Sequence, residues 1–203
     1  MRLKVINADA ATQRIKANMI VTDPPFEMDG KQLADILNNY DADHLLLICS
    51  MRQVLELYKY ADQWKLSFQL VMELCVPNRP IHYHLPAYTH CLVCYFTKGK
   101  AKSKFNRKGC LRADTHEPSY FPSIIHAPRE RRTEHGHAKN QQALKDILAC
   151  FDVQSVVDPF AGSGTTGLVC YDLNIDCTMI EMDKANCDLI AKSLRFFGIE
   201  YEC

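Results

Sequence analysis

The sequence predicts a doubly wound α/β fold, and two observations carry this prediction. Short runs rich in β-branched and other apolar residues alternate with helical patterns, which is typical of a parallel sheet covered by helices. Two of these runs lead directly into loops of unusual composition, at the position where ligands bind in open parallel sheets. The expected strands are Leu3–Asn7, Met19–Thr22, His44–Ser50, Leu66–Leu74, Thr89–Thr97, Ser155–Val157 and Asp176–Glu181. The expected helices are Lys31–Tyr40, Arg52–Gln63, Asn140–Phe151, Thr165–Leu173 and Lys184–Phe197.

One pair of expected strands departs from this alternation. Leu66–Leu74 and Thr89–Thr97 are separated only by the proline-rich segment Pro77–Pro86, without a helical pattern. Strands that are joined without a crossover helix pair in the antiparallel direction. We therefore expect an antiparallel hairpin at one edge of the sheet.

Length and composition indicate an ordinary globular protein. A chain of 203 residues fits one domain with a single core. No run approaches the roughly 18 apolar residues of a membrane span, and Met1–Ile6 resembles a strand rather than a signal peptide. Most of the ten cysteines lie in apolar segments, where free cysteine packs as a small hydrophobe; they include Cys49, Cys75, Cys150, Cys170 and Cys177. We expect free thiols, a cytoplasmic location and no membrane partner.

The net charge of zero conceals a segregation of charge. The segment Lys98–Lys139 holds eleven basic and four acidic residues, a local charge of +7 that leaves −7 on the remainder. A basic segment on an acidic body is typical of a surface that binds a polyanion. A solvated loop with an incidental excess of lysine is the alternative.

The first unusual loop is Asp23-Pro24-Pro25-Phe26, here called the proline loop, which follows the apolar run Met19–Val21. The two prolines stiffen the backbone and carry no N–H, so carbonyls and one carboxylate face a ligand. An exocyclic amino group offers two N–H donors, which Asp23 and the Pro24 carbonyl can accept. Phe26 offers a face for stacking on a flat target. Taken alone, the tetrapeptide also fits a proline-stiffened turn.

The second loop is Asp158-Pro159-Phe160-Ala161-Gly162-Ser163-Gly164, here called the glycine loop, which follows Ser155–Val157. Gly162 and Gly164 allow a close approach of the backbone, and the helix that follows favours an anionic group at its N-terminus. Glu181 ends the next strand, where related folds place the acid that binds ribose hydroxyls. A phosphate-binding loop would need Gly-Lys-Ser/Thr, which is absent. A tight strand-to-helix turn is the remaining alternative.

Together, the two loops resemble those of the β-type amino-methyltransferases of DNA, whose target-base motif precedes the cofactor motif. The resemblance covers nearly the whole chain and implies the Rossmann-like class I methyltransferase sheet. In that order Leu3–Asn7 is the third strand and Met19–Thr22 the fourth, whereas the first two strands come last, a circular permutation. The first and fourth strands are neighbours, so the proline and glycine loops are expected side by side.

The resemblance implies transfer of a methyl group from S-adenosyl-L-methionine to a base flipped out of duplex DNA. Aspartate at the first position of the proline loop favours adenine N6, and Phe26 stands where tyrosine is usual. Cytosine N4, RNA, a protein amide and an inactive binding subunit stay as alternatives. The catalytic residues implied are Asp23, Pro24, Pro25 and Phe26. The cofactor residues implied are Asp9, Lys139, Asp158, Phe160, Gly162, Ser163, Gly164, Thr165, Thr166 and Glu181.

Two departures accompany these assignments. Lys139 is followed by Asn140 where the family has proline, and Asn140 has the alternative role of capping the next helix. Cys91 and Cys94 form a CxxC pair, but their odd spacing in an apolar strand directs them to opposite faces of the sheet. We therefore expect packed thiols and no metal site.

The domain organisation that we expect is one catalytic domain, 1–203, with 99–136 as a small target-recognition insertion. In this insertion Lys100, Lys102 and Lys104 are candidates for phosphate contacts, and Arg129, Arg131 and Arg132 for reading bases. So compact an insertion fits a short recognition site, a homodimer or a partner chain. Small unattached enzymes of this kind occur in phages and mobile elements.

Overall fold

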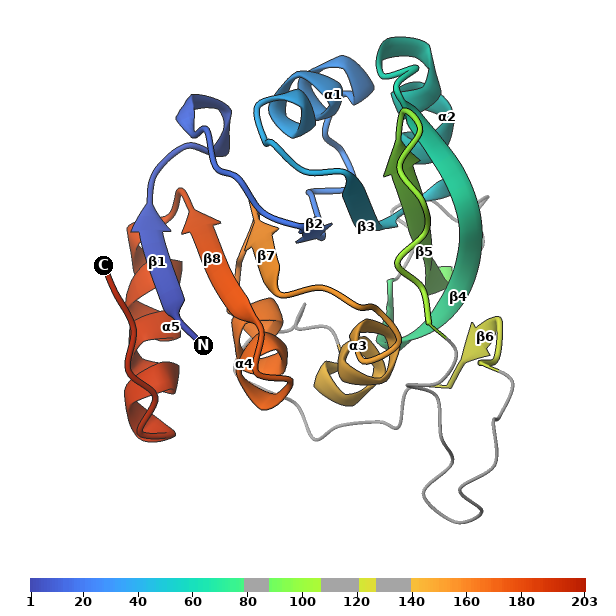
Figure 1. Cartoon of the computed structure of the whole chain (residues 1–203). Coiled ribbons are helices and arrows are strands. Elements are labelled where there is room, and N and C mark those ends of the chain that lie inside the picture. The colour runs from blue at the N-terminus through green and yellow to red at the C-terminus, as the bar shows by residue number, and fades with distance from the viewer. Residues whose placement is uncertain (79–87, 107–120, 127–139) are drawn as a thin grey trace.

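An eight-stranded sheet lies between two layers of helices (Figure 1). The computed structural model describes residues 1–78, 88–106, 121–126 and 140–203, with 74–78 and 88 described by backbone alone. The strands are β1 (Leu3–Asn7), β2 (Met19–Thr22), β3 (His44–Cys49), β4 (Trp64–Asn78), β5 (Tyr88–Lys98), β6 (Ile124–Ile125), β7 (Ser155–Asp158) and β8 (Asp176–Glu181). The helices are the short 3-10 helix η1 (Ala10–Thr12), α1 (Gly30–Asn38), α2 (Met51–Tyr60), α3 (Gln141–Leu148), α4 (Thr165–Asp172) and α5 (Lys184–Phe196).

The strand order is β1-β8-β7-β2-β3-β5-β4-β6, which confirms the predicted circularly permuted class I sheet. The first five strands in this order are parallel, and β5 pairs antiparallel with both β3 and β4. The predicted hairpin therefore exists, and it is longer than the apolar pattern indicated. The two-residue strand β6, which the sequence did not predict, pairs with β4 beyond it.

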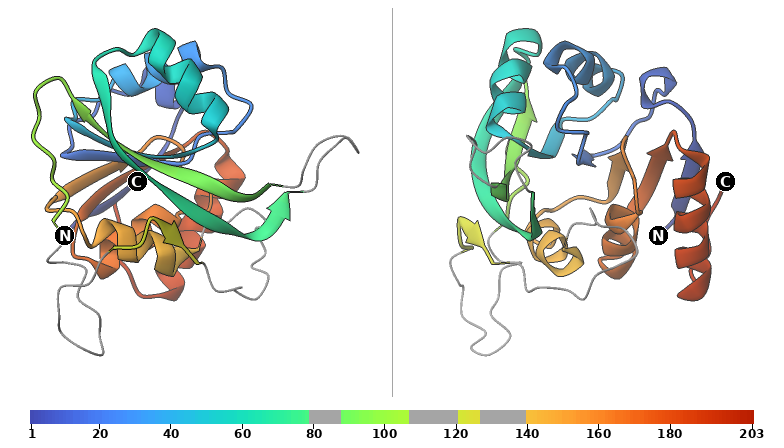
Figure 2. Two further views of the ribbon diagram at one scale, coloured as in Figure 1. Left: turned by 90° about the vertical axis from the view of Figure 1, so that its right-hand side faces the viewer. Right: turned by 180° about the vertical axis from the view of Figure 1, so that it is seen from behind.

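The central strands are buried on both faces, as expected for parallel strands between helical layers. In β2, Met19 and Val21 pack into the core beneath α3, α4 and α5, whereas Ile20 packs into the core beneath α1 and α2. Figure 2 shows the two helical layers on opposite faces of the sheet. This double burial holds the carboxyl ends of β2 and β7 in a fixed position.

Side-chain caps define where four of the five α-helices in the described ranges begin. Asp29 caps α1, Ser50 caps α2 and Asp183 caps α5. Asn140 caps α3, because its side chain accepts a hydrogen bond from the Ala143 N–H over 2.8 Å. The capping role predicted as the alternative for Asn140 is therefore confirmed. The helix α4 begins at Gly164 without a side-chain cap.

The cysteines mostly pack as expected. Cys91 and Cys94 are buried in the two different cores, which confirms that the CxxC pair points to opposite faces of the sheet. Cys150 is disulfide-bonded, so the expectation of a free thiol there, drawn from its apolar neighbours alone, is wrong. The free cysteines of the described residues are Cys49, Cys91, Cys94, Cys170, Cys177, Cys187 and Cys203.

Within the described ranges, no helix combines the length and the apolar character that crossing a membrane requires.

Candidate functional site

The proline loop and the glycine loop lie side by side at the carboxyl ends of β2 and β7. These strands are parallel neighbours, with Met19 opposite Val156 and Ile20 opposite Val157. A buried hydrogen bond joins the two strand ends, since Thr22 Oγ1 donates to Asp158 Oδ1 over 2.9 Å. The adjacency predicted from the permuted strand order is thus present in the structure.

Asp158 is the most deeply buried carboxylate of this region. Only 3% of its surface is exposed, and three donors surround it: the Thr22 hydroxyl, the Thr166 hydroxyl at 2.6 Å and the Phe160 N–H at 3.0 Å. Burial raises the pKa of Asp158 to about 6, although the three hydrogen bonds act in the opposite direction. Both carboxylate oxygens are therefore occupied within the protein. The structure gives Asp158 a linking function between β2, β7 and α4.

The glycine loop is fastened to the end of β8 by Glu181. The Gly162 N–H donates to Glu181 Oε2 over 2.7 Å, and the Asp183 N–H donates to Glu181 Oε1 over 2.8 Å. Gly162 has φ of 51°, and a Cβ built there would meet no atom closer than 4.0 Å. Space is therefore left beside the backbone at Gly162, next to the Glu181 carboxylate.

Gly164 serves a different purpose from Gly162. Its φ is 80°, and a Cβ at this position would lie 3.0 Å from Ile190 Cγ1 on α5. Glycine is required here by the left-handed backbone and by the packing of α5. The helix α4 that follows has no side-chain cap, so the N–H groups of its first turn are available to an anionic group.

The proline loop is held from outside by two hydrogen bonds to one carbonyl. Pro25 O accepts from the Met28 N–H at 3.0 Å and from Gln53 Nε2 at 3.0 Å. Asp23 is half-buried, Pro24 is buried and the half-buried ring of Phe26 packs against the larger core. These contacts therefore hold the proline loop in place at Pro25.

Gln53, like Thr22, is a residue of this site that the sequence did not identify. The pattern Ser50-x-x-Gln53 is a capping-box signature, and both reciprocal hydrogen bonds of that box are present. This pattern predicts the cap of α2. It contains no information about the second bond to Pro25, which comes from a distant segment.

The predicted cofactor acids lie at three adjacent strand ends. Asn7, the last residue of β1, is opposite Glu181, the last residue of β8. Asp9 follows β1 and is exposed, with its carboxylate capping η1 through the Ala11 N–H at 2.9 Å. Ser163 and Thr165 face each other at 3.1 Å through their hydroxyls. Lys139 lies outside the described residues.

Lys100, Lys102 and Lys104 of the basic segment lie at the opposite end of the sheet, where the parallel strands begin. Because β5 runs antiparallel to β3, the end of β5 lies beside the beginning of β3. Thr97 is opposite His44, and the Lys98 N–H donates to Asp43 O over 2.8 Å. The following loop, which carries Lys100, Lys102 and Lys104, continues along this end of the sheet to the segment before β7, as the Asp152 N–H bond to Lys104 O shows. In Figure 2 (left) this yellow-green loop lies opposite the free end of the β4–β5 hairpin.

These three lysines therefore lie away from the two loops, and their role as phosphate contacts stays a prediction. The positive charge was counted along the sequence. Such a count does not show that the segment begins where the antiparallel strand β5 ends, on the side of the sheet where the parallel strands begin. Arg129, Arg131 and Arg132, the other candidates of the insertion, lie outside the described residues.

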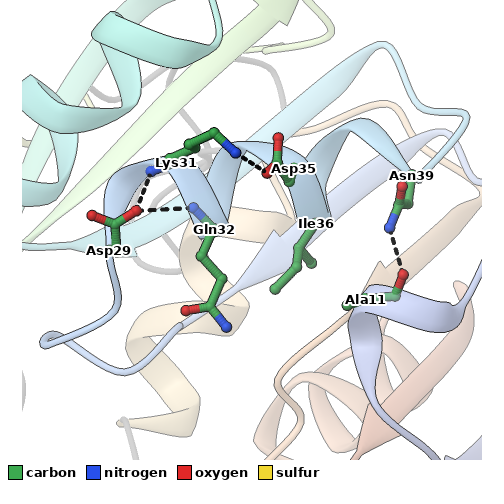
Figure 3. Close-up of a pocket in the computed structure, with 7 residues that line it drawn as sticks. All are labelled: Ala11, Asp29, Lys31, Gln32, Asp35, Ile36 and Asn39. Carbon is green, nitrogen blue, oxygen red and sulfur yellow. Dashed lines mark hydrogen bonds and ion pairs between the residues drawn. The ribbon is translucent and has the colours of Figure 1, made fainter.

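A surface hollow between η1 and α1 (Figure 3) contains none of the predicted site residues. Its polar groups bond to one another: Asp29 caps α1, Lys31 pairs with Asp35 at 3.1 Å, and Asn39 donates to Ala11 O at 2.8 Å. In the part of the chain that is described, no group of three or more His, Cys, Asp or Glu side chains is placed to hold a metal ion.

The permuted sheet, with these two loops at adjacent strand ends, defines the class I methyltransferase fold. A family model described as DNA methylase, of the N6/N4 type, matches residues 86–192, and the chain belongs to this family. The matched range contains the glycine loop and Glu181, whereas the proline loop precedes it.

Solved structures of similar fold span nearly the whole chain. The M1.HpyAVI–SAM complex is 22% identical, with a TM-score of 0.71 over 95% of this chain and 100% of that chain. TTHA0409 from Thermus thermophilus, complexed with S-adenosyl-L-methionine, is 15% identical, with a TM-score of 0.64 over 96% and 93%. The cytosine-N4-specific PvuII DNA methyltransferase is 13% identical, with a TM-score of 0.70 over 94% and 86%. At these identities the likeness establishes the fold. No curated protein matches the sequence.

Proposed function

We propose that this DNA methylase transfers a methyl group from S-adenosyl-L-methionine to N6 of adenine in DNA. The observation that carries the proposal is the adjacency of the proline loop and the glycine loop, joined through Thr22 and Asp158. This adjacency brings a site for an amino group beside a site for a methyl donor.

The cofactor of the family is S-adenosyl-L-methionine, which supplies an electrophilic methyl group on a sulfonium. The residues present fit this molecule. The uncapped N–H groups at the start of α4 suit its carboxylate, and the Glu181 carboxylate suits its ribose hydroxyls. The space beside Gly162 leaves room for the cofactor next to the start of α4 and Glu181.

The proline loop suits the acceptor amine. The Asp23 carboxylate and the Pro24 carbonyl accept its two N–H groups, which directs the nitrogen lone pair toward the methyl group. Phe26, whose ring is partly exposed, stacks on the flipped base, and one such contact offsets roughly 1–3 kcal/mol of the unstacking cost. Orientation and electrostatics, rather than strong base catalysis, supply the rate enhancement.

The choice of base rests on Asp23, because aspartate at this position of the family's motif favours adenine. Cytosine N4 is the second candidate, supported by the likeness to the PvuII enzyme. In both cases the substrate is duplex DNA with a flipped base.

Target recognition is assigned to the insertion 99–136 of a catalytic domain that spans 1–203. Because Lys100, Lys102 and Lys104 lie away from the two loops, the proposal gives the larger share of this function to the remainder of the insertion, which includes Arg129, Arg131 and Arg132. A homodimer or a partner chain would supply further contacts to DNA.

The test is transfer of labelled methyl groups from the cofactor to DNA, RNA and protein in parallel, followed by mass spectrometry of the nucleosides. We expect N6-methyladenine in DNA alone. A dominant N4-methylcytosine peak would establish the second candidate, and label in RNA or protein alone would refute a DNA substrate. Absence of transfer to all three would indicate a binding subunit.

A further inference from the structure

Gln53 is a polar side chain with 0% exposure, and it contacts two separate segments. Its Oε1 accepts from the Ser50 N–H at 3.1 Å, which completes the capping box of α2. Its Nε2 donates to Pro25 O at 3.0 Å, in the proline loop. A buried amide is costly unless it is hydrogen-bonded, and here each end of the amide has a partner.

The proline loop depends on donors from elsewhere in the chain. Pro24 and Pro25 have no N–H, so neither can fasten the loop through its own amide. The Pro25 carbonyl belongs to the peptide plane that leads into Phe26. Its two acceptor bonds, from Met28 just after the loop and from Gln53 on α2, set the direction of that plane.

We infer that Gln53 is a positioning residue that holds the proline loop in its catalytic conformation. It fixes the peptide plane before Phe26 and, through the stiff proline pair, the direction of the Pro24 carbonyl. The inference rests on the proposed function of the loop as the site of the target amine. Because Gln53 is anchored to the start of α2, the loop takes its orientation from a helix packed in the core.

The decisive comparison is between Gln53→Met and Ser50→Ala. Methionine has a similar length and is apolar, so it removes the donor to Pro25 without leaving a large cavity. Ser50→Ala removes the capping hydroxyl, but it keeps the Ser50 N–H that anchors Gln53 and the bond to Pro25. Both variants weaken the start of α2, and Gln53→Met alone frees the loop.

Two readouts follow from this difference. Hydrogen exchange of a peptide that spans 23–28 should be faster in Gln53→Met than in wild type, and unchanged in Ser50→Ala. The kcat for DNA methylation should fall by on the order of ten- to a hundred-fold in Gln53→Met, with the KM for cofactor unchanged. Unchanged exchange and kcat in folded Gln53→Met would overturn the inference, as would an equal loss of kcat in Ser50→Ala.

A second variant keeps the test decisive if Gln53→Met does not fold. Gln53→Glu preserves the acceptor for the Ser50 N–H, but an ionised carboxylate repels Pro25 O. When protonated, the same carboxyl donates to that oxygen. The kcat of Gln53→Glu relative to wild type should therefore rise as the pH falls, and a flat ratio would contradict the positioning role.

Failure of the proposed function is distinguishable from failure of this inference. If the wild-type chain transfers no methyl group to DNA, the proposed function fails. Hydrogen exchange of the 23–28 peptide, which needs no substrate, then decides whether Gln53 holds the loop.

Discussion

Thr22 donates a buried hydrogen bond to Asp158, although the two residues lie 136 positions apart in the sequence. Thr22 immediately precedes the proline loop, and Asp158 is the first residue of the glycine loop. The other oxygen of Asp158 accepts from Thr166 in the first turn of α4. One carboxylate therefore fixes the spacing between the site proposed for the amine and the site proposed for the cofactor.

Thr22→Val should slow methyl transfer and leave cofactor affinity unchanged, because it frees the proline loop from Asp158 without touching α4. The loss of one buried hydrogen bond should lower the free energy of unfolding by about 1–2 kcal/mol. Thr166→Val is the matched control, since it breaks the bond on the cofactor side and should raise the cofactor Kd. Steady-state kinetics, calorimetric titration and urea denaturation measure these effects. Identical kinetic profiles in the two variants would contradict separate functions for the two bonds.

Asp158 should make stability depend on pH in an unusual direction. Its folded-state pKa of about 6 lies above the ordinary value of 3.8, so the folded protein binds the proton more tightly than the unfolded chain. The contribution is fully present below the unfolded pKa, and it is lost as the pH rises through about 6. The change is on the order of 3 kcal/mol.

Asp158→Asn tests this dependence, because an amide of the same shape does not titrate. The difference in unfolding free energy between wild type and Asp158→Asn should shift in favour of the variant as the pH rises from 4 to 7, roughly the range between the two pKa values. Urea denaturation across this range gives the difference directly. A difference independent of pH would indicate that Asp158 has an ordinary pKa.

Asp23→Ala should retain cofactor affinity and lose most of its turnover, because it removes an acceptor that orients the amine. Phe26→Ala should reduce methylation less, by about 1–3 kcal/mol of lost stacking. Single-turnover assays and calorimetry measure the two quantities. Wild-type rates in Asp23→Ala would refute the proposed site.

Glu181→Gln should weaken cofactor binding. Both oxygens of Glu181 accept backbone N–H groups, and the amide nitrogen of glutamine cannot accept either of them, so the glycine loop loses a fastening point together with the proposed ribose partner. Glu200→Gln, at an exposed position, is the control. Gly164→Val would be a poor test, because its clash with Ile190 would disturb folding before it disturbed the ligand. Equal calorimetric affinity in Glu181→Gln and wild type would remove Glu181 from the cofactor site.

The sequence was sufficient for the order of the strands other than β6 and for the location of the two loops, because both follow from local patterns and from the sheet order of the family that the chain resembles. It was insufficient for the bonds that hold those loops. Gln53 appears in sequence as a helix-cap residue, and its bond to Pro25 depends on how α2 packs. The sequence predicts Asp158 as a cofactor residue, and it gives no sign of the burial and the three internal donors that surround this carboxylate in the structure. Neither burial nor a partner from a distant segment is visible in a local pattern.

The lysines and the arginines of the basic segment can be tested separately. Lys100, Lys102 and Lys104 follow β5 at the end of the sheet where the parallel strands begin. The proline and glycine loops lie at the opposite end. Because these lysines lie away from the two loops, replacing all three with glutamine should change DNA affinity and its salt dependence less than the replacement of the arginines does, since only lysines that contact phosphate release counterions on binding.

The corresponding triple replacement of Arg129, Arg131 and Arg132 is the comparison. If these arginines contact DNA, it should weaken binding and flatten the dependence of affinity on salt, and the loss of a base-reading arginine should change which sites are methylated. Titrations of duplex DNA at several salt concentrations, with cofactor affinity as the folding control, measure both variants. A flattened salt dependence in the lysine variant alone would mean that DNA contacts the end of the sheet where the parallel strands begin. Such a path would not be explained by one chain whose two loops lie at the other end of the sheet.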